Sequence, residues 1–366
     1  MLPCAEASKP DLDARVREHA LELGFDVVGV ARADEPLEID HARYLDFVAR
    51  GMHGRMGYLE KNVEARRRLD EASILEGAKS VVCVGRRYGR PASEEDRDAP
   101  LAKKIARYAR GQDYHNHLKK KLRRLAAFIS SLGEDVRARA LCDIEPVLER
   151  AWAARAGIGF VGKNGLVITP GQGSYQLLGE VVTTLELIPD TPIGERCGSC
   201  TRCLDACPTE AFAAPFVLDP RRCIAYMTIE DPELSPAAHR EAIGEHLFGC
   251  DVCQEVCPYN RAAPPPPART VPFHPLMRWD RIDLDDLCKL DEASWDVTFQ
   301  GTPLRRARRA GIARNAVVVA LNSLRGGAQG DEADIARRAI EAAQNDADPR
   351  VRQIAAEAAE ILRGGR

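Results

Sequence analysis

The segment RCGSCTRCLDACPTEAF (residues 196–212) is the most informative stretch of the 366-residue chain, because its four cysteines have the spacing of an iron–sulfur ligand loop. Cys197, Cys200 and Cys203 are each separated by two residues, and Cys207 stands directly before a proline. In proteins with two [4Fe–4S] clusters, three cysteines of such a loop bind one cluster and the fourth binds the other. The segment therefore predicts a second group of ligands elsewhere in the chain.

That second group lies about 50 residues further on, in CDVCQEVCPYN (residues 250–260), where the last of three cysteines again precedes a proline. Its leading cysteine is displaced upstream, and Cys223 in RRCIAYMTIE is the only candidate in the segment. We therefore predict that the two ligand sets cross over. One cluster is bound by Cys197, Cys200, Cys203 and Cys257, and the other by Cys207, Cys223, Cys250 and Cys253.

Zinc is the alternative for these cysteines, in two sites of four thiolates each. Zinc ligands usually come as C-x2-C pairs, whereas three cysteines at successive two-residue spacings favour iron–sulfur clusters. Disulfides are not expected in a reducing compartment. Eight of the twelve cysteines lie between residues 197 and 257, and the others are scattered: Cys4, Cys83, Cys142 and Cys288.

The length of 366 residues predicts two or three domains, and the hydrophobic content of 45% predicts a substantial interior. The sequence contains neither an apolar run long enough to cross a membrane nor the apolar core of a secretory signal. We expect a cytoplasmic monomer without membrane contact. The net charge of −3 argues against indiscriminate nucleic-acid binding, although local basic patches can still contact phosphates.

Two basic runs could form such patches. One extends from Lys103 to Arg124, and the other is LRRARRAGIAR (residues 304–314). The alternative for each run is a solvated helix face.

The first 190 residues alternate between helix and strand patterns, which predicts an α/β domain. Amphipathic spacing and buried-strand composition identify the elements. They are a helix at 11–24, strands at 25–31 and 78–88, a helix at 117–133, and a hairpin or strand pair in SYQLLGEVVTTLEL (174–187).

A cysteine-rich domain follows from residue 191 to 263, and four consecutive prolines begin the remainder, residues 264–366. Prolines cannot continue a helix or a central strand. In the tail, IARNAVVVALNSL and VRQIAAEAAEIL have helical spacing. Their arginines Arg314 and Arg352 lie 38 residues apart, near the period of HEAT-type helix pairs. An ordinary helical cap is the alternative. The fold class expected is α+β and multidomain.

Two further motifs bear on a cofactor. GIGFVGKN (residues 157–164) matches the dinucleotide fingerprint G-x-G-x-x-G, but a predicted helix and not a strand precedes it. It also resembles a phosphate-binding loop, but Asn164 replaces the Ser or Thr that such a loop needs. A nucleotide site is therefore disfavoured. DYHNH (113–117) begins like the cobalamin signature D-x-H-x-x-G, but Leu118 replaces its glycine. A corrin bound here would have no protein histidine on cobalt.

The chain resembles the epoxyqueuosine reductase family. The resemblance is carried by GMHGRMGYLEKN (51–62), RLDEASILEGAKSV (68–81), RYARGQDYH (107–115), DIEPVLERAWAARAGIGFVGKN (143–164), GSYQLLGE (173–180) and the three cysteine motifs with the displaced Cys223. It implies a cobalamin-binding α/β domain, a ferredoxin-like domain with two [4Fe–4S] clusters, and a HEAT-like tail. It also implies reduction of epoxyqueuosine to queuosine in tRNA, with electrons from an unidentified one-electron donor.

The resemblance assigns the catalytic acid to Asp143, whose pKa we expect burial to raise; the alternative for this residue is a helix N-cap. The sequence departs from the family at Ile144, Glu145, Phe160 and Tyr259. The implied cobalamin contacts are Arg68, Tyr108, Asp113, Tyr114, His115, Lys163, Asn164, Ser174 and Tyr226. The implied tRNA contacts are Arg305, Arg306, Arg308, Arg309 and Arg314.

Two other functions fit part of the sequence. A cobalamin-dependent reductase of a small molecule, such as a reductive dehalogenase, would use the same cofactors. A ferredoxin-type electron carrier would need neither Asp143 nor the first 190 residues.

Overall fold

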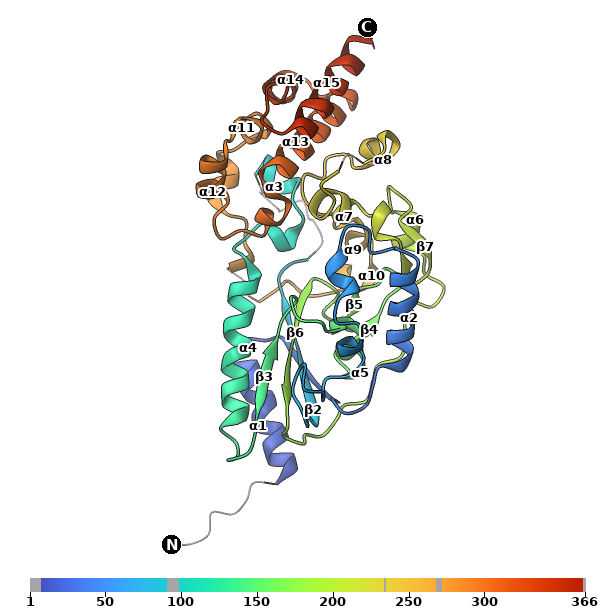
Figure 1. Ribbon diagram of the computed structural model, residues 1–366, viewed down its shortest axis with the longest axis vertical. Helices are drawn as coiled ribbons and strands as arrows, with labels where there is room; N and C mark the ends of the chain where they lie inside the picture. Colours follow the sequence, from blue (N-terminus) through green and yellow to red (C-terminus); the bar gives the residue numbers. More distant parts are fainter. Residues whose placement is uncertain (1–7, 91–98, 234, 268–271, 365–366) are drawn as a thin grey trace.

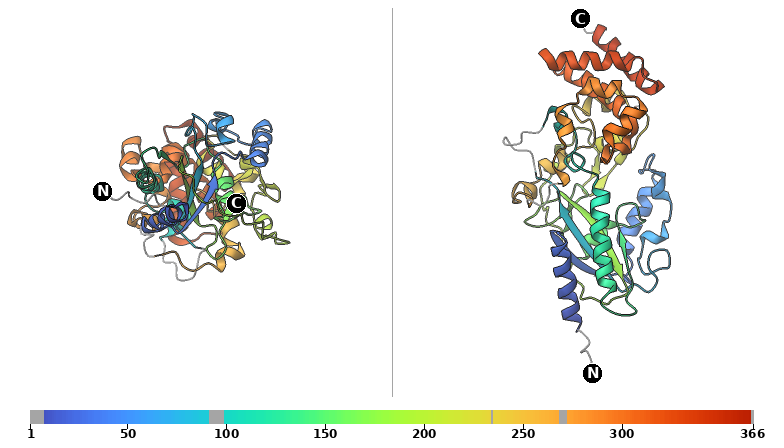
Figure 2. Two further views of the ribbon diagram at one scale, coloured as in Figure 1. Left: turned by 90° about the horizontal axis from the view of Figure 1, so that it is seen from below. Right: turned by 90° about the vertical axis from the view of Figure 1, so that its left-hand side faces the viewer.

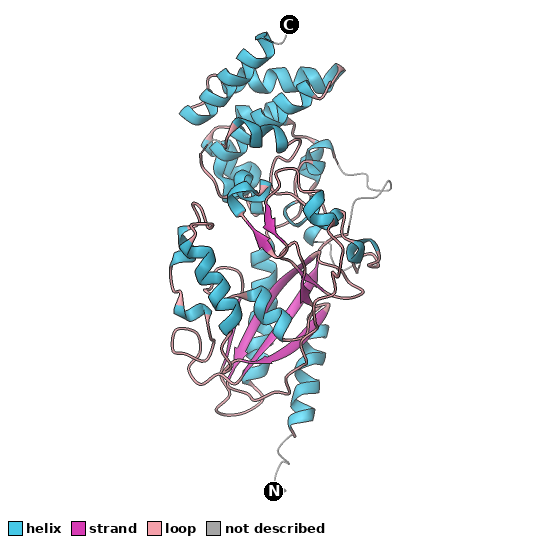
Figure 3. Cartoon of the chain, turned by 90° about the vertical axis from the view of Figure 1, so that its right-hand side faces the viewer, coloured by secondary structure: helices cyan, strands magenta, loops and turns pink. Residues whose placement is uncertain are grey.

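The computed structural model describes residues 8–90, 99–233, 235–267 and 272–364; Cys4 lies outside them. The molecule is elongated, with an antiparallel sheet towards its N-terminal end and a group of helices at its C-terminal end (Figure 1). Figure 3 shows the same division, with the sheet in the lower half and helices above it. The architecture is α+β, as expected.

The central sheet has the order β1-β2-β6-β3, and every neighbouring pair is antiparallel. Its strands are β1 (Val27–Arg32), β2 (Ser80–Arg87), β6 (Gln176–Thr183) and β3 (Ala138–Leu141). The expectation of a strand pair at 174–187 was wrong, because this segment forms the single strand β6. Both edges of β6 are occupied by strands from distant parts of the chain.

Helices cover both faces of this sheet. On one face, α1 (Lys9–Glu22) and α4 (Tyr114–Ser130) lie side by side (Figure 2). Their buried side chains share a core with Val82 and Val181. On the other face, Trp152 of α5 (Glu149–Arg155) packs against the sheet, and α2 (Glu38–Ala49) lies outside it.

The cysteine-bearing segment consists of short elements joined by loops. After α5 the chain enters a small hairpin, β4 (Phe160–Val161) with β5 (Val167–Ile168), and not a helix, which agrees with the rejection of a nucleotide fingerprint. The elements that follow are α6 (Arg202–Asp205), β7 (Phe212–Ala214), β8 (Val217–Leu218), α7 (Ile224–Ile229), α8 (Ala237–Ala242), α9 (Val252–Glu255) and α10 (Pro258–Arg261).

The tail contains α11 (Leu284–Lys289), α12 (Glu292–Phe299), α13 (Arg308–Arg325), α14 (Gly330–Ala343) and α15 (Pro349–Gly364). The two helices expected from the sequence are α13 and α15. Between them α14, which was not predicted, buries a mostly small-residue face against α11 and α13. No helix within the described ranges is long and apolar enough to cross a bilayer.

The largest hydrophobic core does not follow the expected boundaries at residues 190 and 263. Leu101 and Ile105, from the short helix α3 (Pro100–Lys103) and its C-terminal flank, share this core with Phe248 of the cysteine segment and Val317 of α13. The tail is therefore packed against the first half of the chain through the middle segment.

Candidate active site and cysteine pocket

The loop after β3 carries Asp143 in an unusual backbone conformation. Its φ of 60° lies in the left-handed region, which is costly for a residue with a side chain. Its N–H donates to Oε1 of Glu149 at 2.7 Å, and the N–H of Cys142 donates to Oε2 of Glu145 at 2.9 Å. Helix α5 begins at Glu149 with Leu148 as its N-cap, so the interpretation of Asp143 as a helix cap was wrong.

The first turn of α4 supplies the partners of the Asp143 carboxylate. Oδ2 of Asp143 lies 2.6 Å from Nε2 of His115 and accepts a hydrogen bond from the Tyr114 hydroxyl at 3.1 Å. The other ring nitrogen of His115 lies 2.8 Å from Oδ1 of Asp113. Asp113 is itself held in place as the N-cap of α4, where it accepts the backbone N–H of His115. The imidazole is therefore fixed between two carboxylates.

This arrangement sets the charges of both groups. Hydrogen bonds to Asp113 and then to Asp143 raise the pKa of His115 to about 9. His115 in turn lowers the pKa of Asp143, with a smaller contribution from Tyr114. The expectation of a raised Asp143 pKa was therefore wrong. Burial does act to raise the pKa of Asp143, but the hydrogen bond to His115 outweighs it. The neighbouring Ile144 is 71% exposed and adds little shielding.

Tyr58 and Arg306 lie near the Asp143 loop. Arg306 forms a bidentate ion pair with Glu230 at 3.0 and 2.8 Å, and its guanidinium carbon lies 5.5 Å from the centre of the Tyr58 ring. The positive charge of Arg306 also contributes to the lowered pKa of Asp143, after the larger effect of His115. The fold thus brings one predicted tRNA contact beside the predicted acid.

Behind the loop lie two carboxyl groups that sequence reasoning missed. Glu180 is 0% exposed in the middle of β6, and neither of its carboxyl oxygens has a hydrogen-bond partner among the described residues. Burial raises the pKa of Glu180 well above its usual value, and burial raises that of Glu149 to about 7. The only sequence signal was an acidic residue in the apolar strand LLGEVV.

The cysteines fall into two spatial groups. Cys197, Cys200, Cys203 and Cys257 line a single pocket between the β4–β5 hairpin and the first cysteine loop, together with Lys163, Asn164, Ile168, Arg202, Pro258 and Tyr259. Burial raises the pKa of Cys250 to about 12, and the nearby Cys223 and Cys207 contribute to this shift. Burial likewise raises the pKa of Cys253, with contributions from Cys250 and Cys223. Cys207, Cys223, Cys250 and Cys253 are therefore close enough to influence one another electrostatically.

The expected cobalamin contacts are distributed over several places. Tyr114, His115 and Asp113 surround Asp143, and the Tyr108 ring lies edge-on to Tyr114 at 5.9 Å. At the cysteine pocket, Lys163 and Asn164 lie in the turn between β4 and β5. Lys163 donates to the carbonyls of Gly198 and Cys200 at 2.6 and 3.1 Å, whereas Nδ2 of Asn164 is buried without a partner in the described structure.

The remaining three are engaged with protein groups. Ser174 is buried, and its hydroxyl donates a hydrogen bond to Oε1 of Gln254 at 3.0 Å. The Tyr226 hydroxyl accepts the backbone N–H of Arg55 at 2.8 Å. Arg68 pairs with Asp70 through contacts of 2.7 and 2.6 Å.

Two of the five expected tRNA contacts need correction. Arg309 is buried and makes a double ion pair with Asp346 at 2.7 and 2.8 Å. Arg314 is buried and donates to the carbonyls of Asp231, Glu233 and Met227 at 2.6 to 2.8 Å. Both guanidinium groups hold the protein together and are not available to phosphates.

The other three arginines of this run are exposed. Arg305 pairs with Asp296 at 2.7 Å, Arg306 pairs with Glu230, and Arg308 stands at the start of α13 with a φ of 62°.

Comparison with known proteins gives consistent matches. A family model for a 4Fe-4S double cluster binding domain matches residues 196–260, and a model for epoxyqueuosine reductase QueG (DUF1730) matches residues 68–144. The epoxyqueuosine reductase of Gloeobacter violaceus is 41% identical over 312 residues, which cover 83% of this chain and 94% of that protein. That of Xanthomonas campestris pv. campestris is 37% identical over 354 residues, 95% of this chain and 96% of the relative.

Solved structures agree with these matches. A crystal structure of epoxyqueuosine reductase with an epoxyqueuosine-modified tRNA-Tyr stem loop superimposes with a TM-score of 0.78 at 29% identity, covering 97% of this chain and all of that one. The enzyme from Bacillus subtilis, with its catalytic aspartate loop swung out of the active site, has a TM-score of 0.78 at 31% identity. These matches cover 96% of this chain and 90% of the Bacillus protein.

Proposed function

The chain belongs to the epoxyqueuosine reductase family, and we propose that it carries out that family's reaction at the loop that holds Asp143. The reaction removes the epoxide oxygen of epoxyqueuosine in tRNA and leaves the cyclopentene of queuosine. It consumes two electrons and two protons, and both protons end on the same oxygen, which leaves as water. The observation that carries this assignment is the contact between Asp143 and a protonated His115 within a chain that also has a double-cluster domain.

The electrons reach this site through the cysteine segment. We assign one [4Fe–4S] cluster to Cys197, Cys200, Cys203 and Cys257, and the other to Cys207, Cys223, Cys250 and Cys253. Two observations support the crossed assignment: the first four line one pocket, and the pKa values of Cys250 and Cys253 respond to Cys223. An iron–sulfur cluster passes electrons singly, so the physiological donor is a one-electron carrier.

A cobalamin would join the clusters to the substrate. The residues present fit such a group, because a buried amide donor of Asn164 is unpartnered beside the cysteine pocket and Asp143 stands half exposed on its loop. Asn164, Lys163 and Tyr108 are the residues that we expect to hold it. When bound, cobalamin supplies a strongly reducing centre that can break a carbon–oxygen bond.

The protein's own contribution is the supply of protons. At neutral pH the proton is on His115, because the pKa of His115 is about 9 and that of Asp143 is lowered. As the carbon–oxygen bond breaks, negative charge grows on the epoxide oxygen, and an acid positioned there lowers the barrier. Asp143 takes this proton from His115 across their 2.6 Å contact and passes it to the epoxide oxygen. Glu149 fixes the position of Asp143 by accepting its backbone N–H.

A turnover experiment tests this proposal. The protein is reconstituted without oxygen with iron, sulfide and cobalamin, and is incubated with epoxyqueuosine tRNA and a chemical reductant. The tRNA nucleosides are then identified by mass spectrometry. We expect queuosine to form only when clusters and cobalamin are both present. Conversion by cluster-containing protein that lacks cobalamin would contradict the role of cobalamin, and no conversion by the complete protein would contradict the function.

A further inference from the structure

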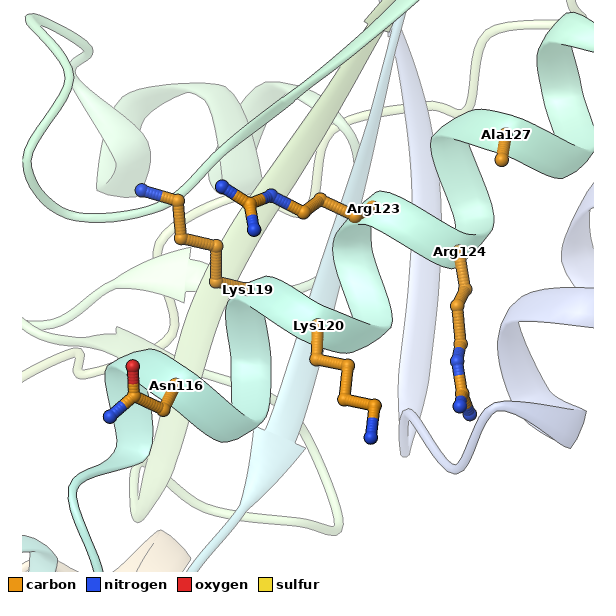
Figure 4. Close-up of a pocket in the computed structure, with 6 residues that line it drawn as sticks. All are labelled: Asn116, Lys119, Lys120, Arg123, Arg124 and Ala127. Atoms are coloured by element: carbon orange, nitrogen blue, oxygen red, sulfur yellow. The ribbon is translucent and has the colours of Figure 1, made fainter. Parts of the chain in front are cut away.

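Helix α4 has an unusual charge pattern. Its 17 residues, YHNHLKKKLRRLAAFIS, contain five lysines and arginines and no acidic residue. Four of the cations, Lys119, Lys120, Arg123 and Arg124, line an open pocket on the outer face of the helix together with Asn116 and Ala127. Figure 4 shows Lys119 and Arg123 on one side of this face and Lys120 and Arg124 on the other. We call these four residues the α4 basic face.

These four cations differ from most others in the protein. None of them has an ion pair or side-chain hydrogen bond with any part of the chain that the structure describes, whereas Arg305, Arg306 and Arg309 all have acidic partners. The opposite face of α4 is apolar and buried in the core against the sheet. The α4 basic face is thus a positively charged surface whose four cations have no acidic partner in the described parts of the chain.

This pattern is unfavourable for the helix by itself. Lys119 and Arg123 are four residues apart, as are Lys120 and Arg124, and like charges at this spacing destabilise a helix. A polyanion bound along the face would remove this repulsion. These four cations therefore do not stabilise the free protein, whereas they would stabilise a complex with a bound polyanion.

The position of α4 identifies the polyanion. The helix begins with Tyr114 and His115, which contact Asp143, and its 17 residues extend about 25 Å away from that site. RNA that places a nucleotide at Asp143 can continue along this direction. An electron donor would instead approach the cysteines, which lie on α6, on α9 and in adjoining loops. Helix α4, by contrast, packs on β3, β6 and α1.

We propose that the α4 basic face binds the phosphate backbone of the tRNA beyond the nucleotide that is reduced. This inference rests on the proposed function, because it takes tRNA as the substrate. It adds the four cations of the α4 basic face to the expected phosphate contacts, of which Arg309 and Arg314 are buried. Contacts of this kind position the RNA without reading its bases.

The test compares two double variants of the complete, cofactor-loaded protein. Lys120→Gln/Arg124→Gln removes two cations from the basic face. Arg281→Gln/Arg363→Gln removes two exposed cations from the tail and is the matched control for net charge. Binding of a fluorescent full-length tRNA is measured by anisotropy between about 50 and 200 mM salt, and thermal unfolding is followed for both variants.

We expect the α4 variant to bind tRNA at least about tenfold more weakly than the control variant at the lowest salt, with a salt slope smaller by about two. Its midpoint of thermal unfolding should be no lower than that of the parent protein, because like-charge repulsion is removed. Equal affinities and slopes for the two variants would overturn the inference. So would tRNA binding that stays unchanged while reduction by a donor protein slows, since the face would then dock the donor.

The outcome is separable from the proposed function. Nucleoside analysis of the parent protein decides whether epoxyqueuosine is reduced, whatever the α4 variant does. A parent protein that reduces epoxyqueuosine tRNA, together with an α4 variant that binds tRNA like the control, would refute the role of α4 alone.

Discussion

The histidine between Asp113 and Asp143 determines the charge of the candidate site, since His115 lies 2.8 and 2.6 Å from their carboxylate oxygens. Its pKa of about 9 means that it carries a proton through the neutral range and loses it above that value. We therefore expect kcat/KM for tRNA reduction to fall as the pH rises through about 9.

His115→Gln tests this assignment by pH profile. The variant should have a much lower rate, by about 10²-fold or more, and no alkaline limb near pH 9. His117→Gln, a change two residues further along α4, is the matched control and should keep the limb. An alkaline limb that persists in His115→Gln would show that another group holds the proton.

The buried carboxyl group of Glu180 should make the stability of the protein depend on pH. Because its pKa is raised in the folded protein, the folded state binds more protons than the unfolded chain at pH values above about 4.5. Stability should fall as the pH rises through this range. Glu180→Gln cannot ionise, so it should be more stable than the parent at pH 8 by roughly 1 kcal/mol or more, with a smaller gain at pH 5.

Urea unfolding at the two pH values measures this difference. Glu241→Gln, at an exposed position on α8, is the control and should show little change at either pH. A gain for Glu180→Gln that is equal at pH 5 and pH 8 would mean that ionisation of Glu180 does not limit stability.

For single residues, the sequence predicted which side chains form the candidate sites better than it predicted their charge and burial. The position of Cys257 in one pocket with Cys197, Cys200 and Cys203 was readable from the spacing, because ligand spacing follows from the size of a cluster. The charge of Asp143 was not readable, because His115 is 28 residues away and meets it only through the fold. Burial of Arg309 and Arg314 was equally hidden, since a basic run has the same appearance whether its partners are phosphates or the protein's own oxygens.

Among the elements, α13 and the loop between α14 and α15 are joined by the buried pair of Arg309 and Asp346. Removing one member of a buried pair leaves the other charge without compensation, at a cost of about 3–5 kcal/mol. We expect this loss of unfolding free energy for Arg309→Met, with tRNA affinity unchanged while the protein is folded.

Arg325→Met provides the comparison for this pair. Arg325 makes an exposed pair with Glu241 at 3.4 Å, and its removal should cost about 1 kcal/mol or less. Guanidinium chloride unfolding and tRNA binding are measured on both variants. A large loss of tRNA affinity in Arg309→Met, without loss of stability, would restore Arg309 as a phosphate contact.

Elements with a clear period were predictable, and elements defined by distant partners were not. Helix α4 has leucines at 118, 122 and 125 on one face, which the helical period reveals. Strand β6 was mistaken for a hairpin, because its neighbours β2 and β3 come from about 40 to 100 residues earlier in the chain. Helix α14 was missed because alanines provide most of its buried face and give a weak apolar signal.

Over the whole molecule, the candidate site lies where distant segments meet. The Asp143 loop follows β3, His115 begins α4, Glu230 follows α7, and Arg306 precedes α13. The shared core that includes Leu101, Phe248 and Val317 holds α7 and α13 together, whereas β3 and α4 pack in the core of the sheet. The composition and the cysteine spacing predicted an α+β protein with two clusters, but the expected division into three domains concealed this common core.

The account depends most on the claim that protons enter the reaction at Asp143. Its most direct test is nucleoside analysis of epoxyqueuosine tRNA after a single turnover with parent protein and with Asp143→Asn, both reconstituted without oxygen and matched for iron and cobalamin content. We predict that the parent forms queuosine, whereas Asp143→Asn still binds the tRNA but forms it at least about 10²-fold more slowly. Equal rates of queuosine formation by the two proteins would contradict the account.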